Sequence, residues 1–310
     1  MNPYQMELDN ITGFIIQGFS NVPELQSPLF VLFLMIYLMI LLGNLTIFTV
    51  ILLNSHLHTP MYIFLLNLSF IDMCFTSTIL PNLLHVLFTQ HKYISFSGCM
   101  VQMYFFVSLA CTEYFLLTAM AYDRYLAICH PLHYVLFMSL KNCGFFIAAA
   151  WTVGFLDPTG HVVLLAKLSF CGSHVIDHFF CDVSPLLKLS CSDTFSAELM
   201  IYIEGVLVTF NSFMLTVTSY FFIISTILKM SSEDRRKAFS TCGSHMTCVV
   251  IFYGTIFCLY VRPTSSYSPE RDKFFSLFYI VLIPMLNPII YTLKNKEFKR
   301  AFIKVKNRAF

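Results

Sequence analysis

Seven long apolar runs, separated by short segments that carry charges, prolines or turn residues, dominate this 310-residue chain. A helix of about 20 apolar residues crosses the hydrocarbon core of a bilayer. Helices are the expected structure, because lipid offers no hydrogen-bond partner to the backbone of an open strand. The sequence therefore predicts an all-α membrane protein, a seven-transmembrane helix bundle with spans at about residues 28–53, 60–87, 97–124, 142–163, 198–228, 238–261 and 274–293.

Composition excludes several other classes of protein. Hydrophobic residues make up 57% of the chain, charged residues make up 12%, and the mean hydropathy is +0.72, so neither a water-soluble globule nor a disordered chain is expected. The 19 basic and 17 acidic residues give a net charge of +2, which provides no basic stripe for nucleic acid. Short loops leave no room for a catalytic domain, and no hydrolase motif is present, so we expect no enzyme activity.

The distribution of charge predicts how the chain is oriented. An odd number of spans places the two ends on opposite sides of the membrane, and 13 of the 19 Lys and Arg residues fall on the side of the C-terminus. The positive-inside rule therefore places residues 1–27 outside, residues 28–293 in the bilayer and residues 294–310 in the cytoplasm. We expect this multi-pass protein in the plasma membrane. Asn10 begins an Asn-Ile-Thr sequon in the outer segment and is a candidate glycosylation site.

The C-terminal segment has its own pattern. Phe298, Phe302 and Val305 recur at helical spacing among basic residues. This pattern predicts a short amphipathic helix that lies on the anionic inner leaflet; a solvated tail is the alternative.

Four of the eleven cysteines fall on the predicted outer side: Cys99, Cys171, Cys181 and Cys191. Four cysteines allow three pairings, and their spacing does not choose among them. A second interpretation is a zinc site, because Cys171, His174, His178 and Cys181 have metal-ligand spacing, with His178, Cys181 and Asp182 remaining if Cys181 were free. Disulfides are favoured in an oxidising compartment.

Two acidic residues lie near the middle of predicted spans. Asp72 is in the second span and Glu113 in the third, and Glu113 shares one helical face with Arg124 and Cys99. Two buried carboxylates repel each other, so either a proton or a hard cation such as sodium is expected between them. The alternative is that they are neutral hydrogen-bonding partners. A third acid, Glu204, is expected near the outer end of the fifth span, where solvent could reach it.

Several motifs in order resemble the olfactory receptors of the rhodopsin-like G-protein-coupled receptors, over nearly the whole chain. The ten-residue block around Asp123-Arg124-Tyr125 is the most specific of them. The motifs are Gly43-Asn44, Leu57-His58-Thr59-Pro60-Met61-Tyr62, Met120-Ala121-Tyr122-Asp123-Arg124-Tyr125-Leu126-Ala127-Ile128-Cys129, Ser219-Tyr220, Lys237-Ala238-Phe239-Ser240-Thr241-Cys242 and Pro284-Met285-Leu286-Asn287-Pro288-Ile289-Ile290-Tyr291.

This resemblance implies pairing of Cys99 with Cys181 and of Cys171 with Cys191, and a sodium site at Asp72 and Glu113. It implies that Arg124 and Tyr220 rearrange to open an inner cleft for a G protein. The residues implied in coupling are Asp123, Arg124, Tyr125, Tyr220, Lys237, Asn287, Pro288 and Tyr291.

The resemblance also implies a mostly apolar ligand site between the outer halves of the third, fifth and sixth helices. Tyr253 is similar to the residue by which olfactory receptors replace a sixth-span tryptophan, and Ile63 stands where the family often has Phe. The expected ligand-binding residues are Met103, Phe106, Val107, Ala110, Cys111, Glu204, Val208, Tyr253, Ile256, Phe257 and Tyr260.

The function that follows is recognition of a small volatile odorant and activation of a stimulatory G protein, which raises cyclic AMP, with no cofactor other than a possible sodium ion. A cation-coupled transporter is one alternative, because of Asp72, Glu113 and the prolines of the seventh span. A rhodopsin-like receptor for a non-odorant ligand is another, although an amine receptor would usually have an acid where this chain has Phe106.

Overall fold

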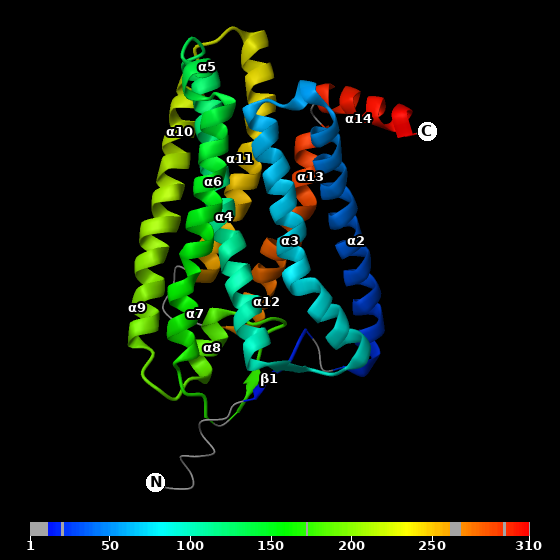
Figure 1. Cartoon of the computed structure of the whole chain (residues 1–310), viewed down its shortest axis with the longest axis vertical. Coiled ribbons are helices and arrows are strands. Elements are labelled where there is room, and N and C mark those ends of the chain that lie inside the picture. Colours follow the sequence, from blue (N-terminus) through cyan, green and yellow to red (C-terminus); the bar gives the residue numbers. More distant parts are fainter. Residues whose placement is uncertain (1–11, 20–21, 172, 261–267, 294–295, 310) are drawn as a thin grey trace.

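A computed structural model of the chain describes residues 12–19, 22–171, 173–260, 268–293 and 296–309. Its helices form seven rods packed side by side, which confirms the predicted seven-helix bundle (Figure 1). In chain order the rods are α2 (Pro23–Leu53); α3 (Pro60–Thr89); α4 (Phe96–Cys129); α6 (Leu140–Leu156) with α7 (Pro158–Ala166); α9 (Phe195–Glu204), a π-helical segment (Gly205–Phe210) and α10 (Asn211–Ile227); α11 (Ser232–Tyr260); and α12 (Pro269–Leu277), a second π-helical segment (Phe278–Leu282) and α13 (Ile283–Leu293).

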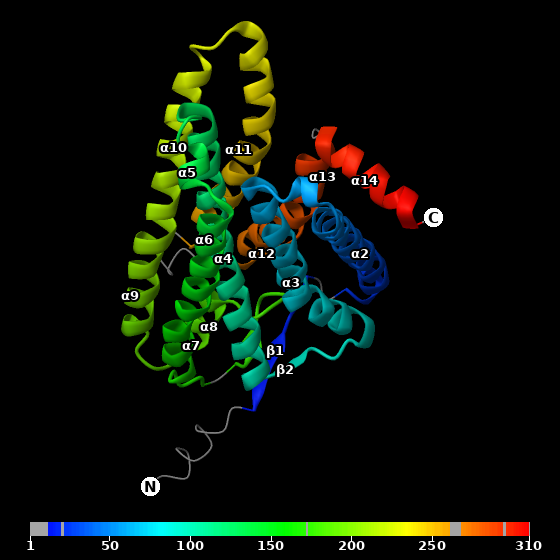
Figure 2. The same ribbon diagram turned by 45° about the horizontal axis from the view of Figure 1, so that its top comes forward.

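Five of these rods are long and apolar enough, by themselves, to cross a membrane. The fourth is divided at Asp157, because Pro158 cannot donate the next backbone hydrogen bond, but α7 continues in the direction of α6 (Figure 2). The sixth, α11, begins with a charged turn and is apolar over His245–Leu259.

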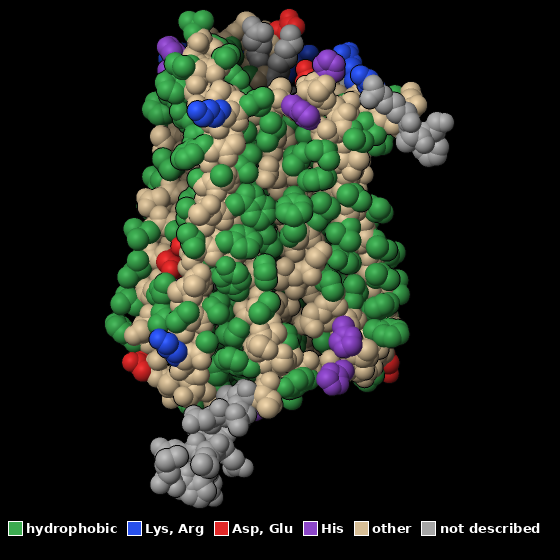
Figure 3. All heavy atoms as spheres, viewed as in Figure 1, with side chains coloured by type: hydrophobic (Ala, Val, Ile, Leu, Met, Phe, Trp, Pro, Cys, Tyr) green, Lys and Arg blue, Asp and Glu red, His purple; other side chains and the backbone are tan. Residues whose placement is uncertain are grey.

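The outer surface of the bundle suits lipid. Leu42, Phe145 and Phe221 are 64%, 70% and 65% exposed, a degree of exposure that large apolar side chains would not keep in water without a partner. On the face seen in Figure 3, apolar side chains cover the middle of the helices, and charged and His side chains lie mostly toward the two ends.

The described ends of the chain lie at opposite ends of the bundle (Figure 1). At one end, α14 (Lys296–Ala309) turns outward past the end of α2 (Figure 1), with Phe298 buried in the core and Phe302 and Ile303 exposed. The predicted amphipathic helix is therefore present. A short helix, α5 (Tyr134–Phe137), lies at the same end.

A small sheet caps the other end, where the sequence predicted no strands. It consists of β1 (Gly13–Ile16) between β2 (Tyr93–Ser95), which is antiparallel to it, and β3 (Val175–Ile176), which is parallel. Gly13 is required in this sheet, because a Cβ atom there would overlap the carbonyl oxygen of Ile94. Residues 13–16, before the first span, thus form a strand, and α2 begins at Pro23 rather than near residue 28.

Two disulfides hold the long loop under this sheet. Cys99 at the start of α4 is joined to Cys181, and Cys171 is joined to Cys191. The zinc interpretation therefore loses both of its thiols, and among the described residues no three His, Cys, Asp or Glu side chains are placed to hold a metal ion. Between Cys181 and Cys191 the loop forms α8 (Val183–Leu189).

Candidate functional site

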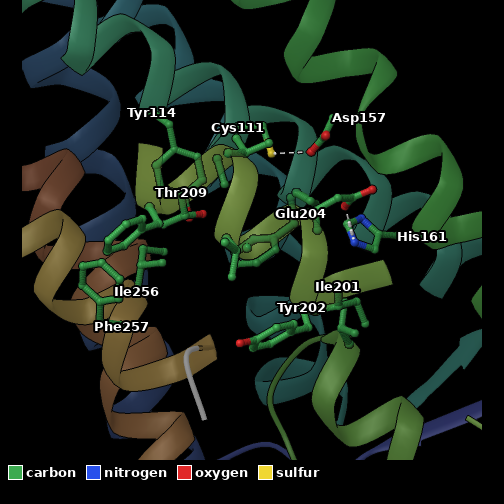
Figure 4. A pocket seen from close by; sticks show the side chains of 18 of the residues that line it. Cys111, Tyr114, Asp157, His161, Ile201, Tyr202, Glu204, Thr209, Ile256 and Phe257 are labelled. Carbon is green, nitrogen blue, oxygen red and sulfur yellow. Dashed lines mark hydrogen bonds and ion pairs between the residues drawn. The ribbon is translucent and has the colours of Figure 1, made fainter. Parts of the chain in front are cut away.

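A cavity of about 190 Å³ lies in the half of the bundle nearest the sheet. Helices α4, α7, α9 and α11 and both π-helical segments contribute to its lining (Figure 4). Most of the lining is apolar, as in other small-molecule sites. The described lining residues are Phe106, Val107, Ala110, Cys111, Tyr114, Asp157, His161, Asp182, Val183, Ile201, Tyr202, Glu204, Gly205, Val206, Val208, Thr209, Phe210, Ile256, Phe257 and Tyr279.

Most of the residues predicted to bind ligand line this cavity: Phe106, Val107, Ala110, Cys111, Glu204, Val208, Ile256 and Phe257. Met103 does not, because it is buried in a separate cluster around the Cys99–Cys181 disulfide. Tyr253 is also outside the lining and packs beneath it. The side chain of Tyr260 lies outside the described residues.

Both π-helical segments lie at the cavity. The wider π-helical turn is uncommon and is often found at functional sites. Gly205 begins the first segment, and Pro284 follows the second, where it lacks the N–H group that would bond to Ile280 in a regular helix. The second segment carries Tyr279 into the lining.

One wall of the cavity is polar, which the sequence analysis did not predict. Nε2 of His161 on α7 faces the Glu204 carboxyl group at the end of α9, and Cys111 donates a hydrogen bond from Sγ to Asp157 Oδ2 at 3.3 Å. Glu204, which solvent could reach near the outer end of its span, lines the cavity with a side chain that is 17% exposed. The signal in the sequence was the pair Asp157 and His161, two ionisable residues one turn apart inside the fourth apolar run.

A chain of hydrogen bonds runs beneath the cavity. Tyr114, which lines the cavity, stacks on Tyr253 with 6.0 Å between ring centroids. The Tyr253 hydroxyl bonds to Ser212 Oγ at 2.5 Å, and Ser212 Oγ bonds to Thr118 Oγ1 at 2.6 Å. These contacts join α4, α10 and α11 directly below the ligand cavity.

The two acids of the predicted sodium site are buried on adjacent helices. Asn287 Nδ2 donates to Asp72 Oδ2 at 2.9 Å, and Cys248 Sγ donates to Asn287 Oδ1 at 3.2 Å. Glu113 is 3% exposed, and its Oε1 has no hydrogen-bond partner among the described residues. Buried carboxyl oxygens of this kind are chemically suited to a hard cation.

The predicted coupling residues form a second group, further from the sheet. Arg124 Nη2 lies 2.8 Å from Asp123 Oδ2, and the Tyr134 hydroxyl donates to Asp123 Oδ1 at 2.8 Å. Tyr220 does not bond to Arg124; its hydroxyl is paired with His245, which the sequence analysis missed.

The structure gives fewer contacts for the remaining predicted coupling residues. The Tyr125 hydroxyl bonds to His130 Nε2 at 2.9 Å. Pro288 packs so closely on α2 that a Cβ atom at Gly43 would lie 3.2 Å from its ring. The side chains of Lys237 and Tyr291, like the whole of Asn10, lie outside the described residues.

Comparison with known proteins agrees with this architecture. The sequence profile of a family described as "Olfactory receptor" matches residues 33–308. Olfactory receptor 5AR1 of Mus musculus is 47% identical over 296 residues, which are 95% of this chain and 96% of that protein. Olfactory receptor 1G1 of Gorilla gorilla gorilla is 49% identical over 299 residues, 96% of each chain. The chain therefore belongs to the olfactory receptor family, whose members are multi-pass G-protein-coupled receptors and not enzymes.

Proposed function

We propose that this receptor binds a small volatile odorant in the cavity and in response activates a stimulatory G protein, which raises cyclic AMP. The observation that carries the proposal is the position of the cavity directly above the contacts among Tyr114, Tyr253, Ser212 and Thr118. A ligand that moves the Tyr114 ring acts on three helices at once.

The size and lining of the cavity suit a ligand of this kind. Its volume of about 190 Å³ is below the range typical of drug-sized ligands, about 300–1,000 Å³. Burial of apolar surface, at about 25 cal/mol per Å², supplies most of the affinity. A volatile molecule with few polar atoms fits these conditions.

Binding activates the receptor only if the ligand prefers the active packing of the helices. To shift the equilibrium between the resting and active packings 100-fold, the ligand must bind the active packing more tightly by about 2.7 kcal/mol. On activation, Arg124 leaves Asp123, Tyr220 leaves His245, and the two freed side chains pair as α11 moves away from α4. The resulting cleft would receive the C-terminal helix of the G protein, with Arg235, Arg236 and Lys237 beside it.

The receptor would lie in the plasma membrane with its N-terminus outside. The excess of Lys and Arg near the C-terminus and the Asn10 sequon support this orientation. Enzymatic removal of N-glycans should increase the mobility of the wild-type receptor on a gel and leave that of an Asn10→Gln variant unchanged. If the wild type carries no glycan, this assignment of Asn10 is wrong.

A sodium ion between Asp72 and Glu113 would stabilise the resting packing. The unpaired Oε1 of Glu113 supports this part of the proposal. Glu113→Gln should then reduce the sodium sensitivity of basal signalling. An unchanged sodium response would leave the interpretation of the two acids as neutral hydrogen-bonding partners.

The direct test is a cyclic-AMP assay in cells that express the receptor, against a chemically broad panel of volatiles. We expect a concentration-dependent response to at least one volatile in wild type, and none with Arg124→Ala at matched surface expression. A coupled transporter would instead move substrate across liposomes that contain the purified protein. A receptor for a non-odorant ligand would be silent across the panel.

A further inference from the structure

The ligand cavity is chemically asymmetric. Asp157, Glu204, His161 and Cys111 lie together on one side, and Ile256 and Phe257 lie on the opposite side (Figure 4). A ligand that uses both sides must have one polar end and one apolar end.

The polar side carries an excess of negative charge. Asp157 and Glu204 are carboxyl groups, His161 is the one basic side chain among the described lining residues, and none of these lining residues is Lys or Arg. Acidic groups therefore outnumber the single basic group on this side of the cavity. A third acid, Asp182, also lines the cavity, and its carboxylate accepts the N–H of Val183.

The hydrogen bonds on this wall leave room for a further donor. Asp157 has one oxygen bonded to the Cys111 thiol, which is a weak donor. His161 faces Glu204 with Nε2, and its Nδ1 is buried without a partner among the described residues. In a neutral imidazole that donates from Nε2, Nδ1 is an acceptor.

We propose that this receptor recognises small aliphatic amines in their protonated form. The ammonium group lies between Asp157 and Glu204, and the hydrocarbon chain packs against Ile256, Phe257 and Tyr279 on the other side. Amine receptors usually have an acid on the third helix at the position where this chain has Phe106. The acids that bind the ammonium group therefore come from the fourth and fifth helices instead. The inference rests on the proposed function of the same cavity.

The test is a cyclic-AMP dose–response series with hexylamine, hexanol, hexanal and hexanoic acid, which share one hydrocarbon chain. Because a hydrogen bond to a charged group exceeds a neutral one in strength, we expect the EC50 for hexylamine to be about 10- to 100-fold lower than that for hexanol. Glu204→Gln and Asp157→Asn keep the shape of each side chain and remove its charge. Each should raise the hexylamine EC50 by about 10- to 100-fold and leave the hexanol EC50 nearly unchanged.

The matched control is Glu198→Gln, an acid on the same helix that is outside the cavity and accepts a hydrogen bond from Thr194. It should leave all four curves unchanged. If a cavity variant does not reach the cell surface, the comparison of the four ligands on the wild-type receptor still tests the amine assignment.

The outcomes separate this inference from the proposed function. A response to hexanol, hexanal or hexanoic acid that equals or exceeds the response to hexylamine overturns the amine assignment alone. Equal loss of all responses in Glu204→Gln and Asp157→Asn, at normal surface expression, also overturns it. Silence toward every volatile of a broad panel, with the receptor at the surface, overturns both.

Discussion

The hydroxyl of Tyr220 on α10 lies 2.5 Å from Nδ1 of His245 on α11, and both side chains are buried. This contact occupies the tyrosine that, in the proposed activation mechanism, pairs with Arg124. At the same time Arg124 is held by Asp123 on its own helix. In the proposed mechanism this packing is that of the resting receptor.

Replacement of His245 should raise ligand-independent signalling. His245→Phe keeps a ring of similar size and removes the partner of Tyr220, so the resting packing loses one hydrogen bond, about 0.5–1.5 kcal/mol. The basal cyclic-AMP level, normalised to surface expression, should rise about two- to tenfold. His56→Phe, which changes an exposed histidine, is the control and should not alter it. A basal level below that of wild type would show that the His245 contact supports the active packing instead.

Removal of the Tyr253 hydroxyl should weaken the effect of a bound ligand on the inner ends of the helices. It should not change the side chains that line the cavity. Tyr253→Phe breaks the bond to Ser212 but keeps the ring that stacks on Tyr114. We expect a several-fold lower maximal response at unchanged surface expression, because α11 is then less firmly coupled to α10. Tyr37→Phe removes a hydroxyl bonded to Ser77 far from this chain and is a suitable control. Identical dose–response curves for Tyr253→Phe and wild type would exclude the hydrogen-bond chain as a route.

The loop that covers the cavity should be less stable at acidic pH. His178 is fully buried against Phe179 and Phe180, and burial together with the nearby Lys273 ammonium lowers its pKa from 6.5 to about 3. The unfolded loop binds a proton below pH 6.5 and the folded loop does not until about pH 3. The free energy of unfolding of the loop is therefore highest above pH 6.5. It falls as the pH drops, by about 2 kcal/mol at pH 5.

Hydrogen exchange of purified receptor at pH 7.5 and pH 5, corrected for intrinsic rates, measures this effect over residues 175–183. His178→Phe keeps an aromatic ring in the stack and should abolish most of the difference between the two pH values. His174→Phe, at an exposed position in the same loop, should preserve it. Equal protection of the wild-type loop at both pH values would contradict the prediction.

The bundle was predictable because each of the seven apolar runs is long and contains few charged residues. The sheet was not, since its strands are two to four residues long and too short for a periodic pattern. Their pairing joins segments near residues 13, 93 and 175, which only the folded bundle brings together.

The candidate site was predictable in its apolar part and not in its polar part. Positions such as Phe106 and Ile256 follow from the family resemblance. The pairing of His161 with Glu204 does not, because it depends on how α7 and α9 are rotated toward each other. The two π-helical segments also change which side chains face inward, and no simple sequence pattern marks them.

We expect a ligand in the cavity to separate the inner ends of α4 and α11. The distance between spin labels at Leu132, which follows α4 and is 93% exposed, and at Arg235 near the start of α11 measures this separation. This distance should increase when an activating odorant and a nucleotide-free stimulatory G protein are both present, and Arg124→Ala should prevent the increase. An unchanged distance in the wild-type receptor under the same conditions would contradict this expectation.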